Sequence, residues 1–124
     1  MLLVYDTLTG NVKRFIDKLD NYDKLKINKN INVSEPYVLV TFTTGFGEVP
    51  NTTSDFLKEN HKYLKAVAVS GNRNWADKFG KAGDIISDKY NIPLLLKFEL
   101  SGTDKDIDKF KQEVAFIEQN SQLD

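Results

Sequence analysis

A polar segment near the N-terminus has the residue types of a phosphate-binding loop. Residues 6–12 read Asp-Thr-Leu-Thr-Gly-Asn-Val and combine two threonine hydroxyls, an amide and a glycine ahead of a helical pattern. Backbone N–H groups at a helix start bind anions, and threonine hydroxyls add donors. The alternative is an ordinary turn in which Thr9 or Asn11 caps the helix. Neither a P-loop motif nor G-x-G-x-x-G occurs in the sequence, which argues against a nucleoside triphosphatase or a dinucleotide enzyme.

A second segment, residues 43–50, has the composition of a loop that lies against a flat ligand. Gly45 and Gly47 flank Phe46 in the run Thr-Thr-Gly-Phe-Gly-Glu-Val-Pro. Glycine lets the backbone approach a planar group closely and change its dihedral angles without a Cβ penalty, and Gly45 is the better pivot. The alternative is that both glycines only form a turn while Phe46 covers the core.

A third segment, residues 70–75, ends at the only tryptophan of the chain, Trp75. An indole ring here could stack on a flat heterocycle, which is worth about 0.5–1.5 kcal/mol beyond the burial of its area. The alternative is that Trp75 begins the apolar face of a helix, because Phe79 follows at helical spacing. The segment Leu100–Thr103 has the same polar character but is predicted to lie at the sheet edge, farther from the switch point between the first and third strands.

Composition limits the class of protein. The 124 residues are 40% apolar and 28% charged, which fits one globular domain over residues 1–124. The absence of cysteine excludes thiolate nucleophiles, iron–sulfur clusters and cysteine zinc sites, so redox chemistry requires a bound cofactor. A net charge of -1 argues against nucleic-acid binding. No apolar run approaches the ~20 residues that span a bilayer, and no signal peptide is visible, so we expect a cytoplasmic protein with no membrane partner.

The remaining polar residues are interpreted as structural. His61, the only histidine, has no carboxylate or hydroxyl pattern beside it. Asp104, Asp106 and Asp108 lack the glycine and the glutamate that complete a calcium loop, and are expected to favour the start of the last helix. We therefore predict no metal site and no catalytic side chain.

Apolar runs alternate with helical patterns, which is typical of a mostly parallel sheet. We predict strands over Leu2–Tyr5, Leu25–Ile27, Tyr37–Phe42, Ala66–Val69 and Leu94–Leu100. Helices are predicted over Val12 to Leu19, from a cap at Thr52 or Thr53 to Leu64, from Trp75 to Tyr90, and from a cap at Thr103 to Ile117, before a polar tail over Asn120–Asp124.

Wholly apolar strands belong inside a sheet, so the predicted fold is α/β, a doubly wound five-stranded parallel sheet of flavodoxin-like order 2-1-3-4-5 with helices on both faces. The loops after the first and third strands then meet at the switch point, where such sheets bind ligands.

Four segments in this order resemble the NrdI family, flavodoxin-like FMN proteins that serve class Ib ribonucleotide reductase. The segments are Thr7–Val12, Thr44–Pro50, Ser70–Trp75 and Phe98–Thr103. The resemblance covers essentially the whole chain, and it is the conjunction of the four segments that makes it specific.

The resemblance implies a set of cofactor-binding residues. The FMN phosphate would be held by the loop of Thr7, Leu8, Thr9, Gly10, Asn11 and Val12. The isoalloxazine ring would be held by Thr43, Thr44, Gly45, Phe46 and Gly47 together with Ser70, Gly71, Asn72 and Trp75, with the indole at or near its face.

The resemblance also implies a role. In this family reduced FMN converts dioxygen to a superoxide-level oxidant, which passes to the radical subunit of the reductase and allows its dimanganese-tyrosyl radical cofactor to form. An electron-donating reductase is the second expected partner. The protein would thus be a redox activator rather than a stand-alone enzyme.

Three other functions are compatible with this fold class. A general flavodoxin electron carrier shares the cofactor but not the oxygen chemistry, and a cofactor-free interaction module shares only the fold. A phosphoacceptor receiver domain needs an acidic cluster after the first strand and an aspartate after the third. This chain has a lone Asp6 and then Thr43, so the receiver is rejected.

Two hypotheses about redox tuning follow from the ring-facing loops. They carry Glu48 against Arg73 and Lys78, and cations near a flavin favour its anionic, fully reduced form relative to the acidic surroundings of electron-carrying flavodoxins. The peptide at Gly45 is expected to flip on reduction so that its carbonyl or N–H meets flavin N5.

Overall fold

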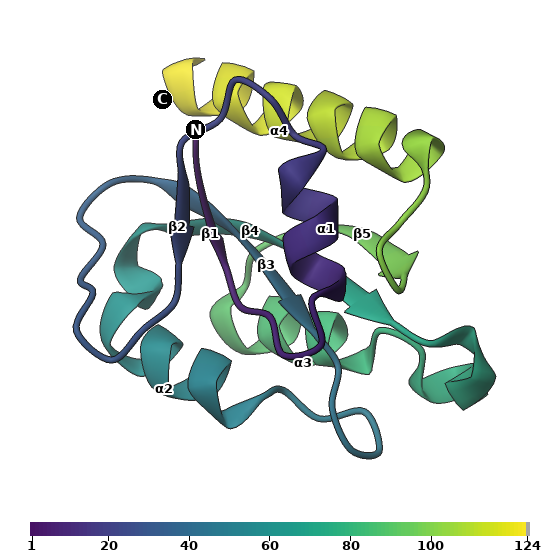
Figure 1. Ribbon diagram of the computed structural model, residues 1–124. Coiled ribbons are helices and arrows are strands. Elements are labelled where there is room, and N and C mark those ends of the chain that lie inside the picture. The colour runs from purple at the N-terminus through teal and green to yellow at the C-terminus, as the bar shows by residue number, and fades with distance from the viewer. Residues whose placement is uncertain (124) are drawn as a thin grey trace.

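A five-stranded parallel sheet runs through the middle of the protein in the order β2-β1-β3-β4-β5 (Figure 1). The computed structural model describes residues 1–123. The strands are β1 (Leu2–Tyr5), β2 (Lys24–Lys26), β3 (Tyr37–Phe42), β4 (Leu64–Gly71) and β5 (Leu94–Glu99). The predicted flavodoxin-like order is therefore confirmed.

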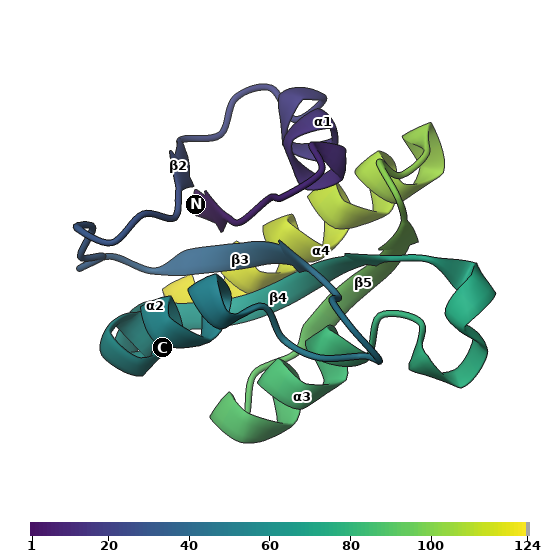
Figure 2. The same cartoon turned by 60° about the horizontal axis from the view of Figure 1, so that its bottom comes forward.

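Helices cover both faces of the sheet (Figure 2). The helices are α1 (Asn11–Asp17), α2 (Asn51–Asn60), α3 (Lys81–Tyr90) and α4 (Asp104–Leu123), with short 3-10 segments η1 (His61–Tyr63) and η2 (Arg73–Lys78). In the second view α1 and α4 lie on one side of the sheet, and α2 and α3 lie on the other. Each pair buries its apolar side chains in a separate core cluster.

An aromatic group holds α1 and α4 against the sheet. Phe15 of α1 stacks on Phe98 of β5 with ring centroids 3.9 Å apart, and meets Phe110 of α4 edge-on at 5.6 Å. All three rings are fully buried, and each contributes on the order of 1.5–3 kcal/mol through burial alone. This packing fixes the position of α1 relative to the end of β5. The first turn of α1 directly follows the loop after β1, which has the residue types of a phosphate-binding loop.

On the opposite face, Tyr37 is fully buried and its hydroxyl donates to the backbone oxygen of Asn60 at 2.7 Å. Burial is the main cause that raises the pKa of this phenol far above its ordinary value, with the nearby Tyr90 adding to it. The hydrogen bond ties β3 to the end of α2.

Several predicted element boundaries were wrong. The second strand begins one residue earlier, at Lys24, and the fourth begins at Leu64, which was assigned to the preceding helix. The fifth strand ends at Glu99 because Leu100 adopts a positive φ of 54°. The last helix continues through 120–123 instead of giving way to a polar tail, and Asp124 lies outside the described residues.

The alternative in which Thr9 or Asn11 caps the first helix is wrong, as is the predicted cap at Thr52 or Thr53, and the predicted cap at Thr103 is confirmed. Residue Gly10 precedes α1 with φ +89° and no side-chain cap, so neither Thr9 nor Asn11 has that role. At α2 the capping position is Pro50, and the hydroxyls of Thr52 and Thr53 instead donate to the Asp6 carboxylate at 2.5 and 2.7 Å. At α4 the prediction holds. The Thr103 hydroxyl accepts from the Asp106 N–H at 3.2 Å and the Asp106 carboxylate accepts from the Thr103 N–H at 2.8 Å, a reciprocal capping box.

The predicted helix starting at Trp75 does not form as one unit. Residues Arg73–Lys78 make the 3-10 segment η2, Gly80 turns the chain with φ +64°, and the α-helix begins only at Lys81. Trp75 is 48% exposed, so it does not start a core-facing stripe. Among residues 1–123 no helix combines the length and apolar character needed to cross a membrane.

Candidate functional site

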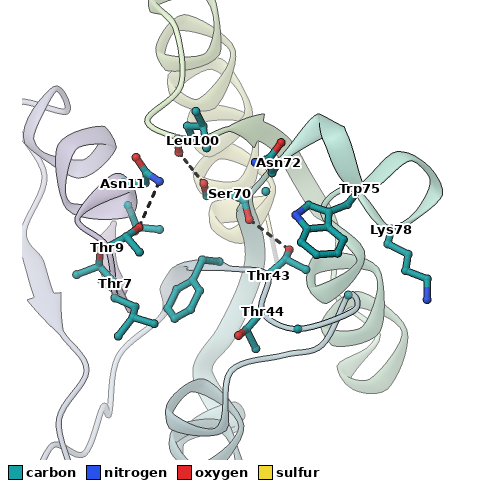
Figure 3. A pocket seen from close by; sticks show the side chains of 16 residues that line it. Thr7, Thr9, Asn11, Thr43, Thr44, Ser70, Asn72, Trp75, Lys78 and Leu100 are labelled. Carbon is teal, nitrogen blue, oxygen red and sulfur yellow. Dashed lines mark hydrogen bonds between the residues drawn. The ribbon is translucent and has the colours of Figure 1, made fainter.

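A pocket of about 270 Å³ opens at the carboxyl ends of β1, β3 and β4 (Figure 3). Its lining residues are Thr7, Leu8, Thr9, Asn11, Val12, Phe42, Thr43, Thr44, Gly45, Gly47, Ser70, Gly71, Asn72, Trp75, Lys78 and Leu100. All the residues predicted to bind a cofactor therefore line one pocket, except Gly10 and Phe46. Three lining residues, Phe42, Lys78 and Leu100, are not among the predicted cofactor-binding residues, although Lys78 was predicted to lie near the ring as a cation.

The loop after β1 supplies hydroxyl and amide groups to one end of the pocket. The hydroxyl oxygen of Thr7 is buried and has no hydrogen-bond partner among the described residues. A buried polar atom of this kind costs about 1–3 kcal/mol unless a ligand or water satisfies it. Beside it the Asn11 amide nitrogen donates to the Thr9 hydroxyl oxygen at 3.3 Å. Unspent hydroxyl and amide donors are what an anionic oxygen requires.

The loop after β3 is a tight turn closed by its own backbone. Thr44 and Glu48 exchange two backbone hydrogen bonds, at 2.9 and 2.7 Å, and Gly45 and Gly47 both adopt positive φ, 55° and 98°. Phe46 at the tip is 72% exposed, so the alternative in which it covers the core is wrong. Both glycines present bare backbone to the pocket at positions where a side chain would be strained.

Trp75 lines the pocket, and the exposed Phe46, which does not line it, lies next to the indole. Their rings meet edge-on with centroids 6.1 Å apart, and the Lys78 ammonium lies 5.6 Å from the Phe46 ring. The η2 segment that carries the indole is held by Asn72, whose side-chain oxygen accepts from the Asn74 N–H at 2.9 Å. Within it Ala76 has φ 52° and ψ -119°, a conformation costly for a residue with a Cβ. Figure 3 shows the indole beside Thr43 at the mouth of the pocket.

The floor between the loops is fixed by Ser70, which is 4% exposed. Its hydroxyl donates to the backbone oxygen of Leu100 at 2.6 Å, and its own backbone oxygen accepts from the Thr43 hydroxyl at 3.2 Å (Figure 3). The ends of β3, β4 and β5 are thereby held together. Leu100 enters the lining because its positive φ turns the chain over the end of β4.

Across the described part of the chain, the pocket lining carries a positive charge and no negative one. No aspartate or glutamate lines it, and Lys78 is its one cation among the described residues. Arg73, which the sequence analysis grouped with Lys78, lies farther out and pairs with Glu99 at 3.9 Å. The Glu48 carboxyl carbon lies 3.4 Å from the position that a Cβ on Gly45 would take. The lining itself suits an anionic ligand.

A larger cavity of about 560 Å³ lies beneath the segment that joins β2 to β3. Three carboxylates line it, those of Asp6, Asp55 and Glu59, against the single cation Lys29. That balance disfavours a phosphate, so the smaller pocket is the better candidate for an anionic cofactor. Within residues 1–123 no group of three or more acidic, histidine or cysteine side chains could hold a metal ion.

Comparison with known proteins agrees with the geometry of the fold. A family model described as "NrdI Flavodoxin like" matches residues 3–112. The chain is 53% identical over 115 residues to "Protein NrdI" of Bacillus licheniformis, covering 93% of this chain and 88% of the relative. It is 49% identical over 117 residues to "Protein NrdI" of Macrococcus caseolyticus, covering 94% and 91% of the two chains.

Two solved structures share the fold at low sequence identity. A short-chain flavodoxin associated with a bacterial microcompartment superposes with a TM-score of 0.76 at 19% identity, covering 96% of both chains. A mutant flavodoxin from Pseudomonas aeruginosa gives a TM-score of 0.52 at 15% identity, covering 94% of this chain and 97% of that one. At these identities the likeness establishes the architecture alone.

Proposed function

The chain belongs to the NrdI flavodoxin-like family, and on that premise we propose that it binds FMN in the pocket and activates the radical subunit of a class Ib ribonucleotide reductase. Reduced FMN would supply the electrons that convert dioxygen to a superoxide-level oxidant for assembly of the dimanganese-tyrosyl radical cofactor in that subunit. An electron-donating reductase would return the flavin to its reduced form. The observation that carries the proposal is the pocket lining, which has a buried hydroxyl without a partner, no carboxylate and one cation.

The phosphate of FMN would lie against the loop that follows β1. The unpartnered Thr7 hydroxyl supplies a donor that the protein alone leaves unused. The hydroxyl of Thr9 and the amide of Asn11 line the same end of the pocket. Three neutral donors suit a phosphate, because hydrogen bonds to an ionised acceptor are about twice as strong as neutral ones.

The isoalloxazine ring would lie between the loops after β3 and β4. Bare backbone at Gly45 and Gly47 lets one edge of the ring approach the main chain. The indole of Trp75, which is half exposed and lines the pocket, supplies an apolar surface for the ring. Lys78 favours the anionic, fully reduced flavin, and no lining carboxylate opposes it.

The activity is tested with the partner present. The purified protein is reconstituted with FMN, reduced anaerobically while visible absorbance is followed, and then exposed to air together with the manganese-loaded radical subunit. We expect the absorbance of a tyrosyl radical to appear in the partner. Flavin binding without radical formation would leave only a general flavodoxin electron carrier, and failure to bind any flavin would overturn the proposal.

The Thr7→Val variant separates ligand binding from stability. Valine has the shape of threonine but lacks the hydroxyl, so the free protein loses an unsatisfied buried group while FMN loses a donor. We expect FMN affinity to fall by roughly tenfold and the free energy of unfolding of the FMN-free protein to rise by about 1 kcal/mol. Both are measured, by FMN titration and by urea unfolding. An unchanged FMN affinity would remove Thr7 from the site.

A further inference from the structure

We infer that Arg14 and Ser101, neither of which lines the pocket, are positioning residues that set the phosphate preference of the site. The inference rests on the proposed FMN site and deepens it. The two residues come from different elements, Arg14 from α1 and Ser101 from the loop between β5 and α4. They meet at the side chain of Asn11, which does line the pocket.

The side-chain oxygen of Asn11 is held by two donors. The Arg14 guanidinium donates through Nη2 to Asn11 Oδ1 at 2.7 Å, and Ser101 donates through Oγ to the same oxygen at 2.9 Å. Ser101 Oγ in turn accepts from Arg14 Nε at 3.0 Å. Because arginine has no acceptor and stays protonated at all ordinary pH, this arrangement fixes which end of the amide faces it.

The fixed amide directs hydrogen-bond donors toward the pocket. With Oδ1 facing Arg14 and Ser101, the amide nitrogen Nδ2 faces Thr9 and donates to its hydroxyl oxygen at 3.3 Å (Figure 3). Thr9 accepts in this bond, so its hydroxyl hydrogen is left to donate elsewhere. The second hydrogen on Nδ2 is left in the same way. The reverse orientation of the amide would present an acceptor to a phosphate, which is also an acceptor.

The loop that carries Ser101 is anchored on both sides, so the hydroxyl has a defined position. Lys18, which directly follows α1, donates to the backbone oxygen of Gly102 at 3.2 Å. A Cβ on Gly102 would lie 2.7 Å from the ring of Phe15, so the loop backbone packs directly on α1. On the other side the Leu100 N–H donates to the Gly71 backbone oxygen at 2.9 Å.

Arg14 also brings a positive charge to the loop without a carboxylate to neutralise it. It forms no salt bridge within the part of the chain that the structure describes. Its Nη1 atom lies 2.9 Å from where a Cβ on Gly10 would be, so the guanidinium packs against the backbone of the loop after β1. Glycine at this position lets the cation come that close. Hydrogen bonding and charge thus act in the same direction, in favour of an anionic group.

The test compares FMN with riboflavin, which has the same ring and no phosphate. We expect Arg14→Ala to weaken FMN binding by roughly tenfold, the effect of losing a charge-assisted interaction, and to change riboflavin binding by less than about twofold. Ser101→Ala should weaken FMN binding by a few-fold with the same selectivity. The matched control is Lys13→Ala, which removes a neighbouring cation of α1 that bonds to Asp17 instead, at 2.6 Å, and should change neither affinity.

A second measurement follows the phosphate itself. The phosphorus-31 resonance of bound FMN should move in Arg14→Ala and stay in place in Lys13→Ala. Equal losses of FMN and riboflavin affinity, or an unchanged FMN affinity in Arg14→Ala, would overturn the inference while leaving the proposed function intact. A wild-type chain that binds neither flavin would overturn the proposed function and this inference with it.

Discussion

At the scale of single residues, Gly45 is where the redox behaviour of the proposed site should be most sensitive. Its φ of 55° lies in a region that β-branched residues avoid, and it lines the pocket. We expect Gly45→Val to change the affinity for one-electron-reduced flavin relative to oxidised flavin by about tenfold. This change is equivalent to a shift of roughly 59 mV in the one-electron potential. An anaerobic redox titration of the FMN-loaded variant measures the change.

The ratio of FMN to riboflavin affinity is the internal control for Gly45→Val. The phosphate end of the pocket is formed by the loop after β1, so this ratio should stay at the wild-type value. An unchanged redox titration would show that the backbone at Gly45 takes no part in tuning the flavin.

Residue types predicted most of the pocket lining because each loop combined hydroxyls, amides and glycine in a short run. Residue types alone did not place Leu100 in the lining, and they predicted Lys78 only as a cation near the ring. Lys78 reaches the pocket because η2 turns the chain back on itself, and Leu100 because a positive φ follows β5. Arg14 lies within a predicted helix and no local pattern marks it further, because its partner Ser101 is 87 residues away in sequence.

At the scale of elements, β1 and α2 are joined by a buried hydroxyl. Thr53 donates to the Asp6 carboxylate at 2.7 Å and lies 2.7 Å from the hydroxyl of Thr41. We expect Thr53→Val to lower the free energy of unfolding by about 1–3 kcal/mol, because it leaves a buried carboxylate and a buried hydroxyl short of partners. Urea unfolding followed by circular dichroism measures the loss.

The neighbouring Ser54 offers a matched control for this prediction. Its hydroxyl makes no side-chain hydrogen bond within residues 1–123, so Ser54→Ala should change the stability by less than about 0.5 kcal/mol. A Thr53→Val protein as stable as the wild type would show that Asp6 is satisfied without this hydroxyl.

Elements were predictable where local pattern and burial agree. The run Leu2–Tyr5 is wholly apolar and the run Tyr37–Phe42 is apolar except for Thr41, and the predicted bounds of both strands are the observed ones. The helix starts were harder, because the choice between capping and a distant partner is made by tertiary structure. The Thr52 and Thr53 hydroxyls bond to Asp6, more than 40 residues earlier, and no local rule contains that information.

At the scale of the whole molecule, the buried phenol of Tyr37 should make the protein less stable at alkaline pH. Burial raises the pKa of Tyr37 above its usual value, so the folded state keeps a proton that the unfolded chain releases above pH about 10. The free energy of unfolding should therefore fall as the pH rises beyond that point. Tyr37→Phe should be less stable at neutral pH by about 1 kcal/mol, because it loses the bond to Asn60, but should show a flatter decline in alkali.

Urea unfolding between pH 7 and 11 checks this prediction. Tyr63→Phe, which changes a half-buried ring at the surface, is the control and should follow the wild-type decline. Parallel declines for the wild type and Tyr37→Phe would show that other groups cause the alkaline instability.

Over the whole molecule, four of the six exposed large apolar side chains among the described residues gather at one edge. Leu8, Phe46, Trp75 and Leu100 are each at least 46% exposed, and all four belong to the loops around the pocket. The parallel topology produces this arrangement, since every strand ends at the same edge of the sheet. These loops thus present exposed apolar surface around the pocket.

The position of Trp75 makes the intrinsic fluorescence of the protein a probe of the pocket edge. It is the only tryptophan, and it is half exposed at the rim of the pocket, so indole fluorescence reports this edge of the sheet and not the core. A flat, light-absorbing ligand beside the indole would quench that emission almost completely. Unfolding would change its wavelength little, because the ring already contacts water in the native state. Indole emission is therefore well suited to follow binding and poorly suited to follow denaturation.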